Sequence, residues 1–314
     1  MKKQFIAKFL LGSMAISGLL SPVSAQKTAP PPPPAAKARP IVFAVLNDGS
    51  TLEPIAYINK SKFEAPANGS DDESVLIPFN RNYYKKGTVY KLIFGGAVAG
   101  TSTVKSADPK SECGKNIGNA ITKTTKTPLK GMVMALATNE PVKATASNRR
   151  KPTAAEKAEA DSLAKAEFAK QKLTPKALKY HNLTALDVDN DGKAELVGSY
   201  YVEIDKLTRG LLFFIASKGS SDKYSVGYQE YRNVDQEKVM SGDIKALDGG
   251  VYNELLLDVF DADGDGTAEI FTYVQAFEGS GFNIYRRNGS KWTKAFEGSP
   301  ATSSGRTADA PRSP

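Results

Sequence analysis

The sequence predicts a mainly β protein, with a β-rich N-terminal domain, one connecting α-helix and an antiparallel β domain near the C-terminus. Three observations support this fold class. Short runs of apolar and β-branched residues alternate with turns rich in Gly, Asn and Asp, which is typical of strands. One long segment combines a helix-capping signature with strong helix formers. The C-terminal part repeats the order strand, acidic loop, strand.

Two segments precede the predicted fold. Residues 1–25 have the pattern of a secretory signal peptide, in which lysines precede an apolar stretch at 9–20 and small residues end at Ala25. We expect cleavage near Ala25 and an exported protein, either periplasmic or secreted. Residues 26–40 contain a run of consecutive prolines and predict a stiff, extended spacer. No later run is apolar over the length of a membrane span, so we expect no transmembrane segment in the mature form.

Residues 41–145 are interpreted as a basic, β-rich domain, and the sequence leaves its role open. The Asn-Asp-Gly segment at 47–49 and the Gly pair at 95–96 are turn signals between apolar runs. Residues 116–128, rich in Thr and Lys, are expected to form an exposed loop. Strands are expected at residues 41–46, 52–58, 74–78, 88–94, 100–104 and 130–137.

Residues 146–176 are expected to contain a linker and the connecting helix. Thr153, followed three residues later by Glu156, forms a capping-box signature. Ala, Glu, Lys and Leu dominate residues 154–172, and these are good helix formers. We therefore expect one helix, which ends before Pro175 because the residue that precedes a proline is disfavoured in the helical region.

Residues 177–298 are expected to form an antiparallel β domain of two repeated units. Each unit contains a strand, an acidic loop and a second strand. Residues 299–314 have no hydrophobic pattern and are expected to be a disordered tail. Strands are expected at residues 183–188, 195–204, 210–216, 254–260, 269–277 and 282–287, and around Trp292.

The two acidic loops, residues 187–195 and 261–269, carry the strongest chemical signal in the chain. Both have carboxylates at positions 1, 3, 5 and 9 and Gly at position 6, where a positive φ turns the chain back. Converging carboxylates repel unless a hard cation lies between them, and calcium accepts six to eight oxygens in flexible geometry. An EF-hand is excluded because position 12, which requires Glu, is Gly198 in one loop and Thr272 in the other.

We therefore predict about two Ca²⁺ ions per chain. Magnesium is a weaker candidate because it requires a near-ideal octahedron, and a solvated turn without an ion is the structural alternative. The predicted carboxylate ligands are Asp187, Asp189, Asp191 and Glu195 for one ion, and Asp261, Asp263, Asp265 and Glu269 for the other. Lys193 and Thr267 are expected to contribute their backbone carbonyls.

The loop segments 187–196 and 261–270, each flanked by strand patterns, resemble the calcium loops of FG-GAP repeats, also called VCBS repeats. The resemblance covers about residues 180–298. It implies blade-like antiparallel units with calcium in a strand-connecting loop, usually in adhesion, ligand binding or scaffolding. The family often has Asp at position 9, where both loops here have Glu. Two units cannot close a ring of about four to eight blades, so we do not expect a closed propeller.

Charge is divided unevenly along the chain. Residues 26–180 contain 25 Lys and Arg against 13 Asp and Glu, a net charge of +12. Residues 181–298 contain 12 against 20, a net charge of −8. The basic part can attract an anionic envelope polymer or phospholipid headgroups, or its lysines can simply keep the surface soluble. The expected partner is an anionic envelope polymer or another exported protein, not nucleic acid, and the oligomeric state stays open.

These features favour an exported, non-catalytic calcium-binding protein that acts as a binding, adhesion or envelope scaffold module. The alternative is an exported hydrolase that uses carboxylates on an envelope or extracellular polymer, with calcium only stabilising the fold. The acidic triplet at 71–73 fits a solvated turn better than a catalytic site. Cys113, the single cysteine, cannot form an internal disulfide, and it is expected to be a tolerated thiol, an intermolecular disulfide partner or a nucleophile.

Overall fold

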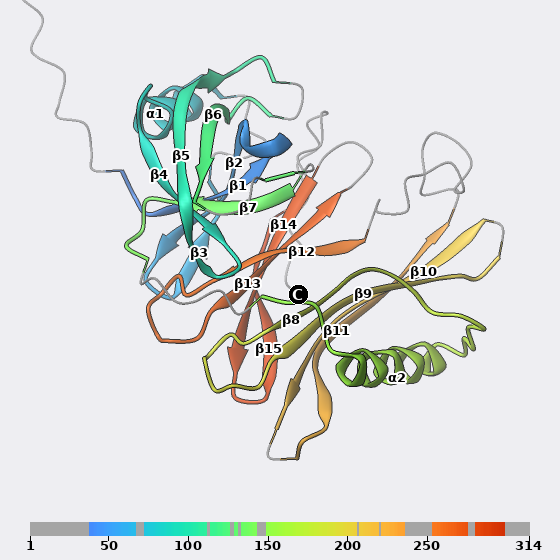
Figure 1. The fold of residues 1–314 in the computed structure, drawn as a ribbon. Coiled ribbons are helices and arrows are strands. Elements are labelled where there is room, and N and C mark those ends of the chain that lie inside the picture. The colour runs from blue at the N-terminus through green and yellow to red at the C-terminus, as the bar shows by residue number, and fades with distance from the viewer. Residues whose placement is uncertain are drawn as a thin grey trace, which may run out of the picture. The chain divides into compact units, whose positions relative to one another are not determined.

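The protein is mainly β, and the described residues form fifteen strands and two α-helices (Figure 1). The computed structural model describes residues 38–66, 72–111, 114–125, 129–130, 133–142, 149–205, 207–219, 221–235, 253–275 and 280–298. The predicted signal peptide, almost all of the spacer, Cys113 and the predicted tail lie outside these ranges. Within them, no helix is both long enough and apolar enough to cross a membrane.

Six strands of the N-terminal region form a closed antiparallel barrel. Their order is β1-β7-β4-β5-β6-β2, and pairing between β1 and β2 closes the ring, while β3 extends the sheet from β2. The barrel removes the unpaired edges that an open sheet of this size would present. The strands are β1 (Ile41–Leu46), β2 (Thr51–Asn59), β3 (Lys62–Glu64), β4 (Val89–Phe94), β5 (Ala97–Asp108), β6 (Ile117–Thr124) and β7 (Val133–Thr138).

Helix α1 (Glu73–Tyr83) packs on the barrel core through Leu76, Phe79 and Tyr83. Because these positions follow helical spacing, they lie on one face of the helix. The Asp72 carboxylate caps the helix by accepting the Ser74 N–H at 2.8 Å. The strand predicted at residues 74–78 is therefore wrong, since the cap and the helical apolar stripe outweigh the short β-like run.

Strand β6 replaces most of the exposed loop predicted at residues 116–128, and that prediction is wrong for residues 117–124. β6 pairs with β5 along its whole length, from Ile117 to Thr124. Its Thr and Ile residues are β-branched, and they fit a half-buried sheet well. One face of this barrel strand is solvated, so half of its residues are polar. A segment rich in Lys and Thr therefore resembles an exposed loop when only the sequence is considered.

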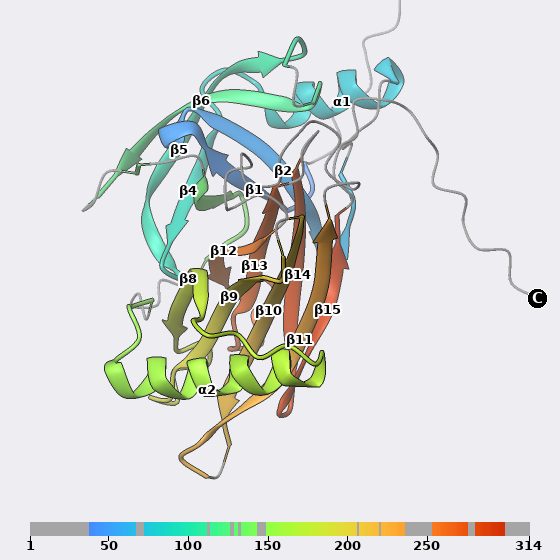
Figure 2. The ribbon, with the colours of Figure 1, turned by 90° about the vertical axis from the view of Figure 1, so that its right-hand side faces the viewer.

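The connecting helix and the next four strands form one layered unit. α2 (Ala154–Lys170) begins at the predicted capping box, with Thr153 and Glu156 bonded reciprocally. It packs Ala160, Ala164 and Phe168 on one face of a sheet ordered β11-β10-β9-β8 (Figure 2). The strands of this sheet, called the first sheet below, are β8 (Lys179–Leu186), β9 (Glu195–Glu203), β10 (Thr208–Lys218) and β11 (Tyr224–Asp235). β11 is absent from the sequence prediction.

The last four strands form a second antiparallel sheet in chain order, β12-β13-β14-β15. One face packs on the first sheet through residues such as Val197, Phe213 and Tyr285. The other face packs on the outside of the barrel, where Phe260 and Phe271 share a core with barrel residues. Its strands are β12 (Glu254–Phe260), β13 (Glu269–Gln275), β14 (Ser280–Asn288) and β15 (Lys291–Glu297).

A buried carboxylate joins the barrel to the second sheet. Asp258 has no exposed surface, and its oxygens accept the N–H groups of Gly95 at 2.8 Å and Gly96 at 3.2 Å. These glycines form the turn between β4 and β5. Burial raises the pKa of Asp258 to about 6, although the nearby Arg149 guanidinium and the backbone donors oppose this shift. Arg149 Nη1 lies 3.9 Å from the Asp258 carboxylate.

The stability of the wild type should depend on pH through Asp258, and the Asp258→Asn variant should lack this dependence. The folded protein holds the proton on Asp258 more tightly than the unfolded chain does, because the folded pKa of about 6 exceeds the ordinary 3.8. Wild-type stability should therefore fall, relative to the variant, as pH rises from about 4 to about 6, by up to roughly 3 kcal/mol. Urea unfolding of both proteins at several pH values measures this difference. A difference between the two proteins that stays constant over this range contradicts the prediction.

Candidate metal centre

The two acidic loops occupy equivalent places in the two sheets. The first connects β8 to β9, and the second connects β12 to β13. A hydrogen bond of 2.8 Å from the Ala268 N–H to the Val188 carbonyl links them. At position 6, Gly192 has a φ of 83° and Gly266 a φ of 95°, so both loops turn back in the left-handed region that favours glycine.

The structure brings together three aspartates in each loop. One carboxylate oxygen from each of Asp187, Asp189 and Asp191 lies within 4.8 Å of the others, and the same holds for Asp261, Asp263 and Asp265. Three ionised carboxylates at this distance repel, and a cation between them would remove the repulsion. We call these two groups the aspartate triads, and each can hold a metal ion.

Backbone hydrogen bonds fix both triads in nearly the same way. The first aspartate of each loop accepts two N–H groups of its own turn, and the third accepts the N–H of position 7. Each carboxylate has about four lone-pair sites, so a bond from a backbone N–H organises the loop and does not by itself prevent metal binding. The donors to Asp187 are Asp191 at 3.1 Å and Gly192 at 3.0 Å; those to Asp261 are Gly264 at 2.8 Å and Gly266 at 3.1 Å; Lys193 and Thr267 donate at 2.7 Å to Asp191 and Asp265.

The position-9 glutamates lie outside the aspartate triads. Glu195 and Glu269 are only 2% and 1% exposed, and each accepts the N–H of position 2 in its own loop. These bonds run to Val188 at 3.3 Å and to Ala262 at 2.9 Å. Burial raises the pKa of both glutamates to about 7. Each glutamate therefore anchors the start of its loop, and its role as a metal ligand stays a prediction.

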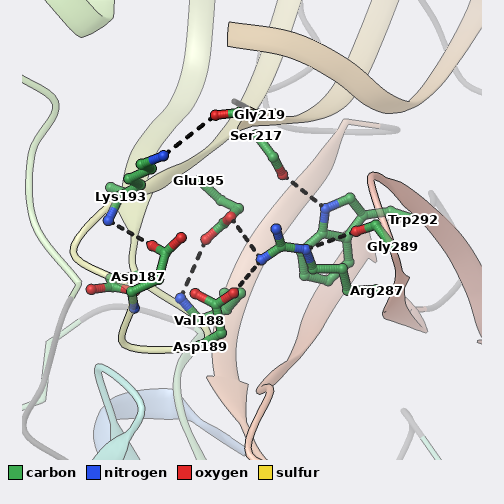
Figure 3. A network of polar contacts seen from close by, with 12 residues as sticks. Asp187, Val188, Asp189, Lys193, Glu195, Ser217, Gly219, Arg287, Gly289 and Trp292 are labelled. Carbon is green, nitrogen blue, oxygen red and sulfur yellow. Dashed lines mark hydrogen bonds and ion pairs between the residues drawn. The ribbon is translucent and has the colours of Figure 1, made fainter. Parts of the chain in front are cut away.

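Two neighbouring arginines of β14 bind the two loops separately. Arg287 Nη1 lies 2.6 Å from Asp189 Oδ2 and 3.3 Å from Glu195 Oε1 (Figure 3). Arg286 Nε donates to Glu269 Oε1 at 2.9 Å, and its Nη2 lies 3.2 Å from Asp263 Oδ2. Consecutive residues of a strand point to opposite faces, so each arginine reaches a different loop.

Sequence reasoning missed this pairing, although the Arg286-Arg287 doublet in a predicted strand was visible. Each loop has four carboxylates, and its arginine supplies a single positive charge. Most of the negative charge of the loop therefore remains available to a cation. Each arginine also contacts the aspartate at position 3. A metal ion would therefore share that carboxylate with the guanidinium, or it would displace the guanidinium from the carboxylate.

The position-7 residues, Lys193 and Thr267, contribute backbone N–H groups as described above. The Lys193 ammonium points to the Gly219 carbonyl, at 3.4 Å, in the connection after β10 (Figure 3). The predicted coordination by the backbone carbonyls of Lys193 and Thr267 stays a prediction.

Both loops border one cavity of about 250 Å³. The residues that line it include Asp187, Asp261 and Asp263, together with Arg149. Gly95 and Gly96 of the barrel also line it, so the loops face the junction between the barrel and the second sheet. One aspartate of the first triad and two of the second therefore border a space that can admit water or an ion.

The acidic triplet at residues 71–73 has a structural task in the described part of the chain. The Asp72 carboxylate caps α1, and Glu73 occupies the first helical turn, where a negative charge is favourable. Asp71 lies outside the described residues. The cap made by Asp72 and the first-turn position of Glu73 therefore give two of the three carboxylates a structural role.

Comparisons with known proteins found no match to a family model, to a curated protein or to a solved structure. The function is therefore inferred from the residues and their geometry.

Replacing Arg287 with Met should destabilise the protein in chelator by about 2 kcal/mol, because Glu195 would keep its burial but lose its guanidinium partner. Met preserves most of the length and apolar contact of the Arg stem. The matched control is Arg232→Met, in a half-exposed pair 3.5 Å from Glu230, where we expect a loss of stability below about 1 kcal/mol. Urea unfolding measures both. If both variants lose the same small amount of stability, Arg287 does not stabilise the loop.

Proposed function

We propose that this chain is an exported, calcium-binding protein without catalytic activity, in which two Ca²⁺ ions stabilise a binding or envelope scaffold module. The observation that carries this proposal is the recurrence of the same aspartate triad, in the same strand connection, in two separate sheets. An isolated acidic turn is common on protein surfaces. Two turns with matching triads, matching backbone bonds and matching arginine partners favour a shared ligand chemistry.

Calcium fits the donor set better than other common metals. All side-chain donors in the triads are carboxylate oxygens, which suit hard cations, and no Cys or His takes part. The triads lie on turns of half-exposed and exposed residues, so water can complete the six to eight ligands that calcium takes. Magnesium would require a stricter octahedron at shorter distances.

The two sheets support an interpretation as two blade-like units of the FG-GAP or VCBS kind. Each is a four-stranded antiparallel meander with its acidic loop between the first and second strands. A ring is not needed to cover their outer faces, since α2 covers the first sheet and the barrel covers the second. Two units can therefore form a stable assembly without closing a propeller.

A stabilising role for calcium follows from the position of the loops. Each loop joins the first two strands of its sheet, and the link from Ala268 to Val188 connects one loop to the other. A ligand that binds only the folded state adds about 2.7 kcal/mol at 100 times its dissociation constant. Extracellular modules bind calcium with dissociation constants on the order of 10⁻⁴–10⁻³ M, which suits filling after export.

The partner proposed for this module is an anionic envelope polymer or another exported protein. The signal-peptide pattern favours function in the periplasm or outside the cell, where adhesion and scaffolding proteins act.

Isothermal titration calorimetry of the purified protein with CaCl₂ should detect about two bound ions per chain. Both aspartate triads present the same donors, so we expect two sites of similar affinity. Titration with MgCl₂ under the same conditions should give weaker binding. A fully folded protein that binds no calcium would falsify the proposed metal chemistry.

Replacing Asp191 and Asp265 together with Ala should lower the melting temperature in calcium but change it little in chelator. These residues hold position 5 of each loop, where their main structural bond is to a single backbone N–H. At saturating calcium the free energy of unfolding should fall by a few kcal/mol, because the variant no longer gains stability from bound calcium. Asp222→Ala, at an exposed aspartate in a turn outside the acidic loops, is the control and should change neither value. Equal losses in calcium and in chelator would show that the aspartates act without metal.

A further inference from the structure

The outer wall of the barrel carries a regular two-row surface on strands β4, β5 and β6. Lys91, Thr101 and Lys123 are register partners across the three strands, and Val89, Thr103 and Ile121 form the neighbouring row. Register partners in an antiparallel sheet project from the same face. We call these six residues the lysine face.

The alternation of each strand shows that the lysine face points away from the barrel core. Tyr90 and Leu92 of β4, Val104 of β5 and Ala120 of β6 belong to the buried interior. Residues between them in each strand must therefore point outward. Val89 and Ile121 are 57% and 52% exposed, and both lysines are exposed.

The lysines of this wall lack acidic partners in the part of the chain that the structure describes. The side chains of Lys91, Lys105 and Lys123 make no hydrogen bond or ion pair there, and neither do those of Lys85 and Lys86 in the turn before β4. That turn lies beside β5, since the Gly87 N–H donates to the Val104 carbonyl at 2.9 Å. Asp108, at the far end of β5, is the one acidic residue within the three strands.

Unpaired lysines held on a rigid sheet form a positive surface that is complementary to a repeating anion. Lys91 and Lys123 lie two strands apart, so their backbones are separated by about 10 Å. Between them, the Thr101 and Thr103 side chains present hydroxyl groups that make no hydrogen bond within the described residues. A ligand that carries both carboxylates and hydroxyls matches this combination.

We propose that the lysine face binds a linear acidic polysaccharide. The inference deepens the proposed binding role and rests on it for the choice of an exported partner, but it does not depend on metal in the acidic loops. Single-stranded nucleic acid would need aromatic side chains for stacking, and the six residues of the lysine face include none. An anionic membrane would need a larger apolar area than Val89 and Ile121 provide.

The test measures binding of a short oligogalacturonate to the full chain, in low-salt buffer with chelator, because calcium would crosslink the sugar. The wild-type protein should bind, and added salt should weaken the binding. Lys91→Gln combined with Lys123→Gln should weaken it by about tenfold, as expected for the loss of two exposed charge contacts. Neutral dextran should not bind.

The matched control removes two exposed lysines elsewhere, Lys165→Gln and Lys176→Gln, whose side chains make no hydrogen bond or ion pair within the described residues. This control should bind like the wild type. Equal weakening in both variants, or no binding by the wild type, overturns the proposal. Binding to phosphatidylglycerol vesicles without binding to oligogalacturonate would overturn it in favour of a lipid surface.

Calcium titration of the same variants separates this proposal from the proposed function. The lysine variants should bind calcium normally, and the double aspartate variant at positions 191 and 265 should bind oligogalacturonate normally. If calcium binding fails while the lysine face still selects the polysaccharide, the metal proposal fails alone.

Discussion

Each of the two four-stranded sheets is apolar on both faces, and the structure depends on neighbouring layers that keep both faces from solvent. Consecutive buried residues along β10, Gly210 to Ser217, show that neither face of the first sheet meets solvent there. α2 covers one face, and the second sheet covers the other. The second sheet then needs a cover of its own, and the outer wall of the barrel provides it. Removal of any layer would expose apolar surface, so the barrel, the two sheets and the helix stabilise one another.

This layering also places the charged groups. β14 lies inside the second sheet, so its two arginines project from opposite faces and reach one acidic loop each. The loops are therefore partly neutralised from within the protein, which explains how so many carboxylates can gather before any ion binds. The buried Glu195 and Glu269 and the position-3 aspartates tie the loops to these arginines, while Asp191 and Asp265 are exposed at the turns. A cation in either triad would therefore meet the guanidinium at the position-3 carboxylate.

The lysine face and the aspartate triads belong to different parts of the fold, while Arg286 and Arg287 accompany the acidic loops. The lysine face lies on β4, β5 and β6, whereas the aspartate triads lie in loops of the two sheets. A polyanion that contacts the lysines would avoid the repulsion of the acidic loops. A cation attracted to the triads would meet little competition from the lysines. The two surfaces can therefore carry independent binding roles in one protein.

The sequence by itself determined the local structures whose signals are local. The capping box of α2, the strands that flank the acidic loops and the convergence of three aspartates at alternate positions follow from short-range geometry. Tertiary structure decided what depends on distant partners: the closure of the barrel, the helix at 73–83, the pairing of β6, and the arginines that reach Asp189 and Asp263. Sequence spacing reports which side chains share a face of one element, but it does not report which element packs against that face. For that reason the triads were visible in the sequence, whereas the arginines and the lysine face emerged only from the fold.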